Sequence, residues 1–203
     1  PVRYVTNRSS GKMGFAIAEA LREKGAEVTL VTGPTQLTDP KGINVIHVQS
    51  AEDMFNAVKE RYNAQDIIFK AAAVSDYTPS EVLDHKMKKR EGDLSVTFKR
   101  TTDILKYLGD NKKHQYLVGF AAETQNIEAY AQDKLARKNA DVIISNNVGD
   151  QSIGFSSDDN EILNNCANLM GAKKTMENER TGKRGLRRDP DCVRVLDAGK
   201  ENY

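Results

Sequence analysis

The sequence predicts an α/β fold of the Rossmann-like type, in which helices cover both faces of a mostly parallel sheet. Two observations support this expectation. Over the first 150 residues, short β-branched or apolar runs alternate with segments of helical periodicity about ten residues long. The turns that follow these runs are polar and contain small residues. Parallel sheets of this type bind ligands at the carboxyl ends of their strands, so these turns are the first candidates for a functional site.

Each expected element has its own local signal. The run 27–32 is β-branched and is closed by Gly33-Pro34, which is typical of a strand. Gly25 stands where a helix ending at 24 needs a C-terminal cap, and Ser50 with Asp53 has the spacing of a capping box. We expect helices over 15–24, 51–62, 103–108, 127–138 and 162–170. We expect strands over 2–6, 27–32, 43–48, 67–69, 94–98, 116–120 and 141–145.

Composition and charge exclude several classes of protein. The 203 residues carry a formal net charge of +1, which gives no strong field for nucleic acid or for a membrane surface. No run approaches the roughly 20 apolar residues that a membrane helix needs, and the first residues have no signal-peptide pattern. Two cysteines make neither a disulfide framework nor a zinc site. We therefore expect a protein of the reduced cytoplasm.

The C-terminal segment differs from the rest of the chain. No aromatic residue lies between Phe155 and Tyr203, and the periodic pattern fades from Glu161. Gly182, Gly185 and Pro190 interrupt a polar stretch that has little apolar material to offset the entropy of ordering. We therefore predict a nucleotide-binding domain over 1–161 and a divergent polar segment over 162–203, for which disorder is one interpretation.

The turn Asn7–Gly14 leads from the first expected strand into a helix. Free backbone N–H groups at a helix N-terminus suit an anion, so this turn is a candidate phosphate or nucleotide site. It matches neither the Walker A pattern nor GxGxxG. The alternative is an ordinary βα turn that Ser9 or Ser10 caps.

The segment 71–77 leaves a buried strand through small residues. Small side chains let a flat base or a sugar approach the backbone, and Asp76 could accept from ribose hydroxyls or face a magnesium ion. The alternative is close packing of the strand against a helix, followed by an exposed turn.

Basic residues occur in two further places. The run Lys86–Arg90 puts four cations in five residues, and such a loop can close over a polyphosphate or can be a solvated turn. On the expected helix 127–138, Lys134 and Lys138 stand on one face, where they could hold phosphates or lie at the surface. Tyr130 with Lys134 has the Tyr-x-x-x-Lys spacing of short-chain dehydrogenases, but the glycine-rich dinucleotide turn of those enzymes is not seen.

Taken together, these pieces resemble a known family, the bacterial phosphopantothenate–cysteine ligases, which form the C-terminal half of a bifunctional coenzyme A biosynthesis flavoprotein. The resemblance runs from Pro1 to about Glu161 and rests on an ordered set of short motifs. They are NRSSGKMG (7–14), AAVSDY (72–77), KMKK (86–89), Asp103-Ile104-Leu105, GFAAE (119–123) and Asn146-Asn147.

The resemblance implies a CTP-dependent ligase with a Rossmann-like fold that forms a homodimer. The carboxylate of 4′-phosphopantothenate would attack the α-phosphate of CTP, giving an acyl-cytidylate and pyrophosphate, and the amine of L-cysteine would then displace CMP. Mg²⁺ would accompany the triphosphate, and no metal ligands are identified. The flavin-dependent decarboxylase half, to which the family is normally fused, has no counterpart here, so we expect no flavin in this chain.

The resemblance also implies roles for particular residues. Asn7 matches the asparagine that converts the acyl-cytidylate, where an amide could stabilise developing charge. Lys86 matches the lysine essential to activation, where it would offset charge on the α-phosphate. The implied nucleotide contacts are Lys70, Ala71, Ala72, Asp76, Lys86, Thr102, Asp103, Ile104, Leu105, Phe120, Lys134 and Lys138, with Phe120 beside the cytosine.

Three departures from the family pattern leave alternatives open. Thr102 stands where proline is usual, the family's first strand and its Gly-Gly-Thr turn have no counterpart before Pro1, and 164–203 does not resemble the family's end. The alternatives are a short-chain dehydrogenase that uses Tyr130 and Lys134, a truncated nucleotide-binding subunit without catalysis, and a nucleic-acid binder that uses 86–90 and 180–188. Near-neutral charge and the lack of interleaved aromatics count against the last.

Overall fold

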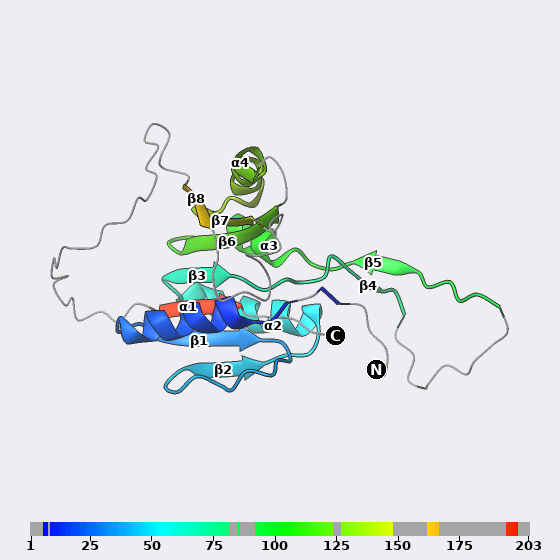
Figure 1. Ribbon diagram of the computed structural model, residues 1–203, viewed down its shortest axis with the longest axis horizontal. Coiled ribbons are helices and arrows are strands. Elements are labelled where there is room, and N and C mark those ends of the chain that lie inside the picture. Colours follow the sequence, from blue (N-terminus) through cyan, green and yellow to red (C-terminus); the bar gives the residue numbers. More distant parts are fainter. Residues whose placement is uncertain are drawn as a thin grey trace.

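A seven-stranded sheet forms the centre of the molecule. The structure is a computed structural model that describes residues 6–7, 9–81, 85, 92–123, 127–147, 162–166 and 194–198. The strand order is β2-β1-β9-β3-β6-β7-β8, and every neighbouring pair is parallel except β7 with β8 (Figure 1). The predicted α/β class with a mostly parallel sheet is confirmed.

The helices and strands follow the predicted order closely over the first 150 residues. The helices are α1 (Lys12–Glu23), α2 (Ala51–Arg61), α3 (Ile104–Asn111) and α4 (Ile127–Lys138), with a short 3₁₀ turn at Tyr62–Ala64. The strands of the sheet are β1 (Glu27–Thr32), β2 (Asn44–His47), β3 (Ile67–Lys70), β6 (Tyr116–Glu123), β7 (Val142–Asn147), β8 (Ile162–Cys166) and β9 (Arg194–Ala198).

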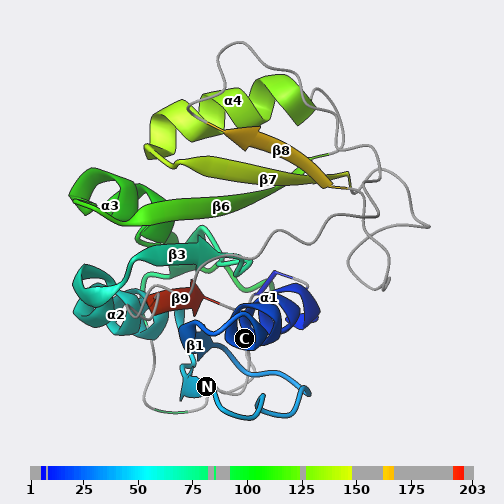
Figure 2. The same cartoon turned by 90° about the vertical axis from the view of Figure 1, so that its left-hand side faces the viewer.

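Two apolar clusters hold the helices against the sheet. On one face, Phe15 and Ala18 of α1 pack on Val28 and Leu30 of β1. A second cluster joins α2, α3 and α4 to the strands, and Met54, Leu108 and Ile143 are among its fully buried members. Figure 2 shows α1 and α2 on opposite sides of the sheet. Helices on both faces explain why the strands are apolar runs without strict alternation.

The predicted capping box at the start of α2 is confirmed. The Ser50 hydroxyl accepts from the Asp53 N–H at 3.1 Å, and the Ser50 N–H donates to the Asp53 carboxylate at 3.0 Å. Two of the free N–H groups of the first turn are thereby satisfied, which fixes the point where the chain turns from β2 into the helix.

A two-stranded antiparallel arm projects beyond the carboxyl ends of the parallel strands (Figure 1). It consists of β4 (Tyr77–Pro79) and β5 (Phe98–Arg100). The predicted strand over 94–98 is therefore wrong except at Phe98, because a strand forms only where β4 offers a partner. Four large apolar side chains of the arm and its approach are exposed, namely Tyr77, Leu94, Val96 and Phe98.

The segment after residue 161 contributes two strands to the sheet. The predicted helix over 162–170 is wrong for Ile162–Cys166, which pairs antiparallel with the open edge of β7. No strand was predicted at Arg194–Ala198, yet it lies between β1 and β3. The predicted division at 161 stays a prediction, and residues 2–5 of the first predicted strand lie outside the described residues. Within the described part of the chain, no helix has the length and apolar character to cross a membrane.

Candidate functional site

The carboxyl ends of β3 and β6, the start of α1 and one face of α4 meet in a continuous chain of polar contacts. Asn7 contacts the segment after β3, that segment contacts Thr101, and Asp103 two residues later contacts Lys138. Lys134 contacts the backbone of β6. The structure thus brings together residues that lie far apart in the sequence at the edge where parallel sheets bind ligands.

Asn7 ties the turn before α1 to the segment after β3. Its side-chain Nδ2 donates to the carbonyl oxygens of Ala73 at 3.2 Å and Val74 at 3.1 Å. Two carbonyl partners require the nitrogen of the amide on that side, so the orientation follows from the hydrogen bonds themselves. Both amide hydrogens are therefore engaged within the protein, and the Asn7 oxygen is the atom left for other contacts.

The turn into α1 leaves its helix end without a side-chain cap. Gly11 is the N-cap residue, with a left-handed φ of 78°, and no side-chain cap hydrogen bond is present there. The hydroxyls of Ser9 and Ser10 accept instead from the N–H groups of Gly11 and Lys12, both at 3.4 Å. Ser9 and Ser10 therefore satisfy N–H groups at the entry to α1, although the N-cap residue itself is Gly11.

The segment after β3 is held from both sides. Lys70 donates from Nζ to the Ala72 carbonyl, and the Thr101 hydroxyl donates to the Ser75 carbonyl at 2.6 Å. The Thr101 N–H also donates to the Asp76 carbonyl at 3.0 Å. Ala72 is buried, while the Asp76 side chain is exposed, and no described residue pairs with its carboxylate. A ligand can therefore reach Asp76 without breaking an existing contact.

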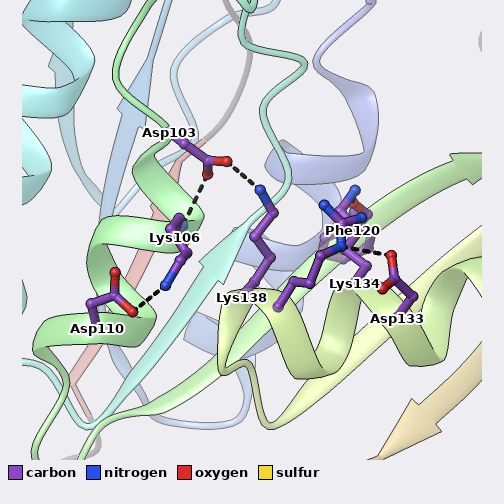
Figure 3. Close-up of polar contacts among 8 residues, drawn as sticks. Asp103, Lys106, Asp110, Phe120, Asp133, Lys134 and Lys138 are labelled. Carbon is purple, nitrogen blue, oxygen red and sulfur yellow. Dashed lines mark hydrogen bonds and ion pairs between the residues drawn. The ribbon is translucent and has the colours of Figure 1, made fainter.

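Asp103 joins the start of α3 to the end of α4. One carboxylate oxygen accepts from the Lys106 N–H at 2.9 Å as the N-cap of α3, and the other accepts from Lys138 Nζ (Figure 3). Partial burial alone would raise the pKa of Asp103, but the hydrogen bonds from Lys138 and Lys106, with the charges of Lys138 and Lys70, hold the pKa below its ordinary value. Asp103 is thus a carboxylate at neutral pH and keeps Lys138 in place.

Replacing Asp103 with Asn should separate its charge from its capping role, because Asn is an equally good N-cap. We expect Asp103→Asn to lower the free energy of unfolding at pH 7 by less than about 1 kcal/mol, since the Asp103 side chain is half exposed. The folded pKa of Asp103 is lowered, so its contribution is present above about pH 4 and is lost as pH falls through the folded pKa. Urea titrations of both proteins at pH 7 and pH 3 measure this. An equal difference at the two pH values would contradict it.

Lys134 reaches from α4 to the backbone of β6. Its Nζ donates to the Phe120 carbonyl at 2.8 Å, and Phe120 itself is half-buried (Figure 3). Lys70 of β3 is in register with Gly119 of β6, which brings Ala71 alongside Phe120. The predicted nucleotide contacts at Lys70, Ala71, Phe120 and Lys134 therefore lie on neighbouring strands and the helix above them.

The ends of α3 and α4 are clasped together. A Cβ on the buried Gly109 would lie 1.8 Å from the carbonyl oxygen of Lys138, so the two helices approach more closely than any side chain allows. Asn139 then takes a left-handed φ of 48° and donates from Nδ2 to the Gly109 carbonyl at 2.7 Å. This clasp fixes the last turn of α4, from which Lys138 reaches Asp103.

Several residues that were predicted to form the site are either buried, exposed without a described contact, or outside the described residues. The side chains of Ile104 and Leu105 are buried in the core, so their contribution to a ligand site is limited to backbone N–H groups at the start of α3. Thr102 is exposed beside Asp103. Lys86 and the other cations of 86–90 lie outside the described residues, and Asn146 and Asn147 are described only as part of β7.

Sequence reasoning missed two residues that build this site. Thr101 holds the segment after β3, and a threonine beside the predicted helix start gave no hint of partners 26 residues earlier. Asn139 follows directly on the predicted helix 127–138, where asparagine is a known left-handed C-terminal residue. That signal was available in the sequence, but the Gly109 contact was not.

One buried hydroxyl near the site has no partner among the described residues. Ser145 of β7 is fully buried, and its Oγ makes no hydrogen bond to any of them. We expect Ser145→Ala to raise the free energy of unfolding by about 1 kcal/mol, because it removes an unsatisfied polar group. Thr32→Val is the matched control, since the buried Thr32 hydroxyl donates to the Gly33 carbonyl at 3.0 Å and its loss should destabilise. Denaturant titrations of both variants measure these changes in the free energy of unfolding. A Ser145→Ala protein less stable than the parent would contradict the expectation.

The described residues offer no ready-made metal centre. No group of three or more His, Cys, Asp or Glu side chains among them could hold a metal ion. The Asp76 carboxylate is exposed, and the Asp103 carboxylate is engaged by Lys138.

Comparisons with known proteins agree on one family. Residues 1–187 match the DNA/pantothenate metabolism flavoprotein C-terminal domain. The chain is 56% identical over 161 residues to the coenzyme A biosynthesis bifunctional protein CoaBC of Bacillus subtilis, covering 79% of this chain and 40% of that protein. It is 47% identical over 163 residues to CoaBC of Haemophilus influenzae, covering 80% and 40%. The chain thus spans about two fifths of the length of the curated relatives it matches.

Solved structures support the same placement. A crystal structure of the C-terminal domain of CoaBC is 45% identical, with a TM-score of 0.65, and the match covers 81% of this chain and 77% of that one. The DNA/pantothenate metabolism flavoprotein from Streptococcus pneumoniae has the same TM-score at 22% identity, which shows the shared fold. The chain belongs to the family of the DNA/pantothenate metabolism flavoprotein C-terminal domain.

Proposed function

We propose that the chain is a CTP-dependent ligase that joins 4′-phosphopantothenate to L-cysteine in coenzyme A biosynthesis, working in the cytoplasm. One observation carries the proposal most directly. Lys70, Lys134 and Lys138 come from β3 and α4 and anchor their ammonium groups at the carboxyl edge of the sheet, beside the small residues that follow β3. Three cations beside a run of small residues suit a nucleotide whose phosphates need charge and whose base needs room.

Different side chains can assist the two steps of the proposed reaction. In the first step the substrate carboxylate attacks the α-phosphate and pyrophosphate leaves, so negative charge builds on the phosphate oxygens. We propose that Lys134 and Lys138 turn from their present oxygen partners toward that charge and that Lys86 acts with them. In the second step the cysteine amine attacks the acyl carbon and CMP leaves. We propose that Asn7 holds the segment after β3 in place for both steps, through its hydrogen bonds to the Ala73 and Val74 carbonyls.

Mg²⁺ would be held mainly by the triphosphate in this proposal. Magnesium usually keeps several waters and takes one or two carboxylates together with substrate phosphates. Asp76 fits that part, because its carboxylate is exposed and no described residue pairs with it. When bound, the ion would neutralise charge on the phosphates and orient them. We propose no flavin for this chain.

A pyrophosphate-release assay tests the proposal directly. The chain is incubated with Mg²⁺, 4′-phosphopantothenate and either CTP or ATP, with and without cysteine. We expect pyrophosphate with CTP in the absence of cysteine, and product with CMP once cysteine is added. CTP binding without pyrophosphate release would favour a non-catalytic subunit. NADPH binding without CTP binding would favour the dehydrogenase alternative based on Tyr130 and Lys134, for which the family match gives no support.

We also propose that the chain forms a homodimer through the arm. Register places Phe98 opposite Pro79, on one face with Tyr77, while Lys99 opposite Thr78 lies on the other face. An isolated two-stranded ribbon is marginally stable, and an exposed apolar face on it gains from a second copy. Phe98→Asp should therefore convert dimer to monomer in sedimentation experiments, whereas Lys99→Asp on the opposite face should not. A dimer that persists in Phe98→Asp would contradict this interface.

A further inference from the structure

Thr101 makes hydrogen bonds to two successive carbonyl groups, one on each side of the Asp76 Cα. Its side-chain hydroxyl donates to the Ser75 carbonyl at 2.6 Å, and its backbone N–H donates to the Asp76 carbonyl at 3.0 Å. The first carbonyl belongs to the peptide plane before the Asp76 Cα, and the second belongs to the plane after it. A single residue thus holds both planes that flank Asp76.

Holding both planes restricts the backbone at Asp76. The relative orientation of the two planes sets φ and ψ, so the Asp76 Cα–Cβ bond keeps one direction. Its carboxylate then has only its side-chain rotamers left. The Ser75 hydroxyl adds a third contact in the same turn, since it donates to the Tyr77 carbonyl at 3.0 Å. None of these bonds involves the exposed carboxylate, so it is aimed without being occupied.

Thr101 is itself fixed from both directions along the chain. It follows directly on β5, which pairs with β4. Two residues later, Asp103 caps α3 and accepts from Lys138. Residues 92–100 are exposed, and Thr101 is the first partly buried residue after them. The hold on Asp76 therefore starts at the base of the arm, and it ties the position of the Asp76 backbone to that of the Lys138 ammonium group.

The outer end of the arm has a similar pair of hydrogen bonds that cannot aim a side chain. There the N–H and the hydroxyl of Ser80 both donate to one carbonyl, that of Thr97, at 2.9 Å and 3.1 Å. One carbonyl fixes one peptide plane, so the residue beside it can still rotate. The Ser80 hydroxyl bond is also exposed, whereas the Thr101 hydroxyl bond is partly buried, where an unmade bond costs more.

We propose that Thr101 is a positioning residue of the nucleotide site, which acts by fixing the direction of the Asp76 carboxylate. This inference rests on the proposed function, in which Asp76 meets the Mg²⁺ that accompanies the triphosphate. Thr101 touches neither nucleotide nor metal in this proposal. Mg²⁺ demands a near-ideal octahedral arrangement, so a carboxylate that is aimed in advance binds it at a smaller loss of freedom.

A double-mutant cycle measures whether Thr101 acts through Asp76. CTP affinity is determined by calorimetry in Mg²⁺ with the full chain. We expect Thr101→Val, which keeps the size and the N–H but loses the hydroxyl, to weaken CTP binding by about 5- to 10-fold. In an Asp76→Asn background the same substitution should change the affinity by less than about 2-fold, because the carboxylate that it aims is gone.

Two variants serve as controls for this cycle. Thr101→Ser keeps the hydroxyl, so it should restore CTP binding to within about 2-fold of the parent. Ser80→Ala removes a hydroxyl-to-carbonyl bond between the same two segments of the arm, but away from Asp76, and should leave CTP affinity unchanged. A general loosening of the arm would instead weaken binding in Ser80→Ala and equally in both backgrounds of the cycle.

Amide exchange in the absence of nucleotide tests the hold on Asp76 by itself. The N–H of residue 101 remains in Thr101→Val, so its protection reports whether the Asp76 carbonyl stays in place. We expect this protection to fall by about 5- to 10-fold, while that of the Ser80 N–H stays at the parent value. In Thr101→Ser the protection at residue 101 should return.

Unchanged protection at residue 101, unchanged CTP affinity in Thr101→Val, or equal weakening with and without the Asp76 carboxylate would overturn the proposal. The ligase assay on the parent chain would stand in each of these cases. If the parent chain released no pyrophosphate, the proposed function would fail, whereas the exchange measurement would still decide whether Thr101 holds Asp76.

Discussion

Asn7→Asp is expected to lower kcat/KM for product formation by about 30- to 100-fold, with pyrophosphate release slowed to a similar extent. The wild-type amide donates to the carbonyls of Ala73 and Val74. A carboxylate there removes two hydrogen bonds and points oxygen at oxygen, which costs about 2–3 kcal/mol in the population of the ordered segment. That segment leads to Asp76, so nucleotide binding should suffer together with the later steps. Single-turnover kinetics with CTP and 4′-phosphopantothenate would measure both.

Asn7→Ala is the matched control for charge. It removes the same two donors without adding an anion, so its effect should be smaller than that of Asn7→Asp and should have the same pattern in both steps. A normal pyrophosphate burst with the acyl-cytidylate accumulating would contradict the tethering role. It would assign the amide instead to the second step, as the resemblance implies.

Gly109→Ala is expected to lower the free energy of unfolding by about 2–3 kcal/mol, although alanine favours helices by about 1 kcal/mol over glycine. The added Cβ would overlap the Lys138 carbonyl, and a backbone atom cannot move aside as a flexible side chain can. The clasp between α3 and α4 must open, so Lys138 should lose its place beside Asp103. Urea titration measures the stability, and CTP titration of the folded fraction should show weaker binding.

Asp110→Ala controls for a change on the same helix. It lies next to Gly109, is exposed, and loses only the surface ion pair with Lys106 at 2.5 Å. We expect a change below about 0.5 kcal/mol and unaltered CTP binding. If Gly109→Ala behaved like this control, the close approach of the two helices would not be a constraint on the fold.

Much of the fold could be predicted from local signals. β1 and α4 begin and end where periodicity and turn residues indicate, because both have strong patterns and clear stops. β8 was misjudged because Ile162–Cys166 is a short mixed run, and only the open edge of β7 makes it a strand. β9 was missed for a similar reason. Five residues that include Arg194 and Asp197 do not look like a central strand until β1 and β3 flank them.

The candidate site was predictable in its location but not in its contacts. The sequence indicates which turns follow strands, and the topology then brings those turns to one edge. It does not indicate that Lys138 pairs with Asp103 or that Lys134 turns to the Phe120 carbonyl, because these contacts join elements that meet only in the folded sheet. For the same reason, Asn7 could be selected from the sequence while its partners Ala73 and Val74 could not.

The position of β9 also bears on synthesis of the protein. Its partners β1 and β3 leave the ribosome well over a hundred residues earlier and must then wait with their facing edges unpaired. Pairing β9 with β1 and β3 closes loops of well over a hundred residues, so this folding step should be slow. During that interval the nascent chain presents strand edges that a chaperone can cover. Slowing translation of the codons between β3 and β9 should therefore lower the yield of folded protein, because it lengthens that interval.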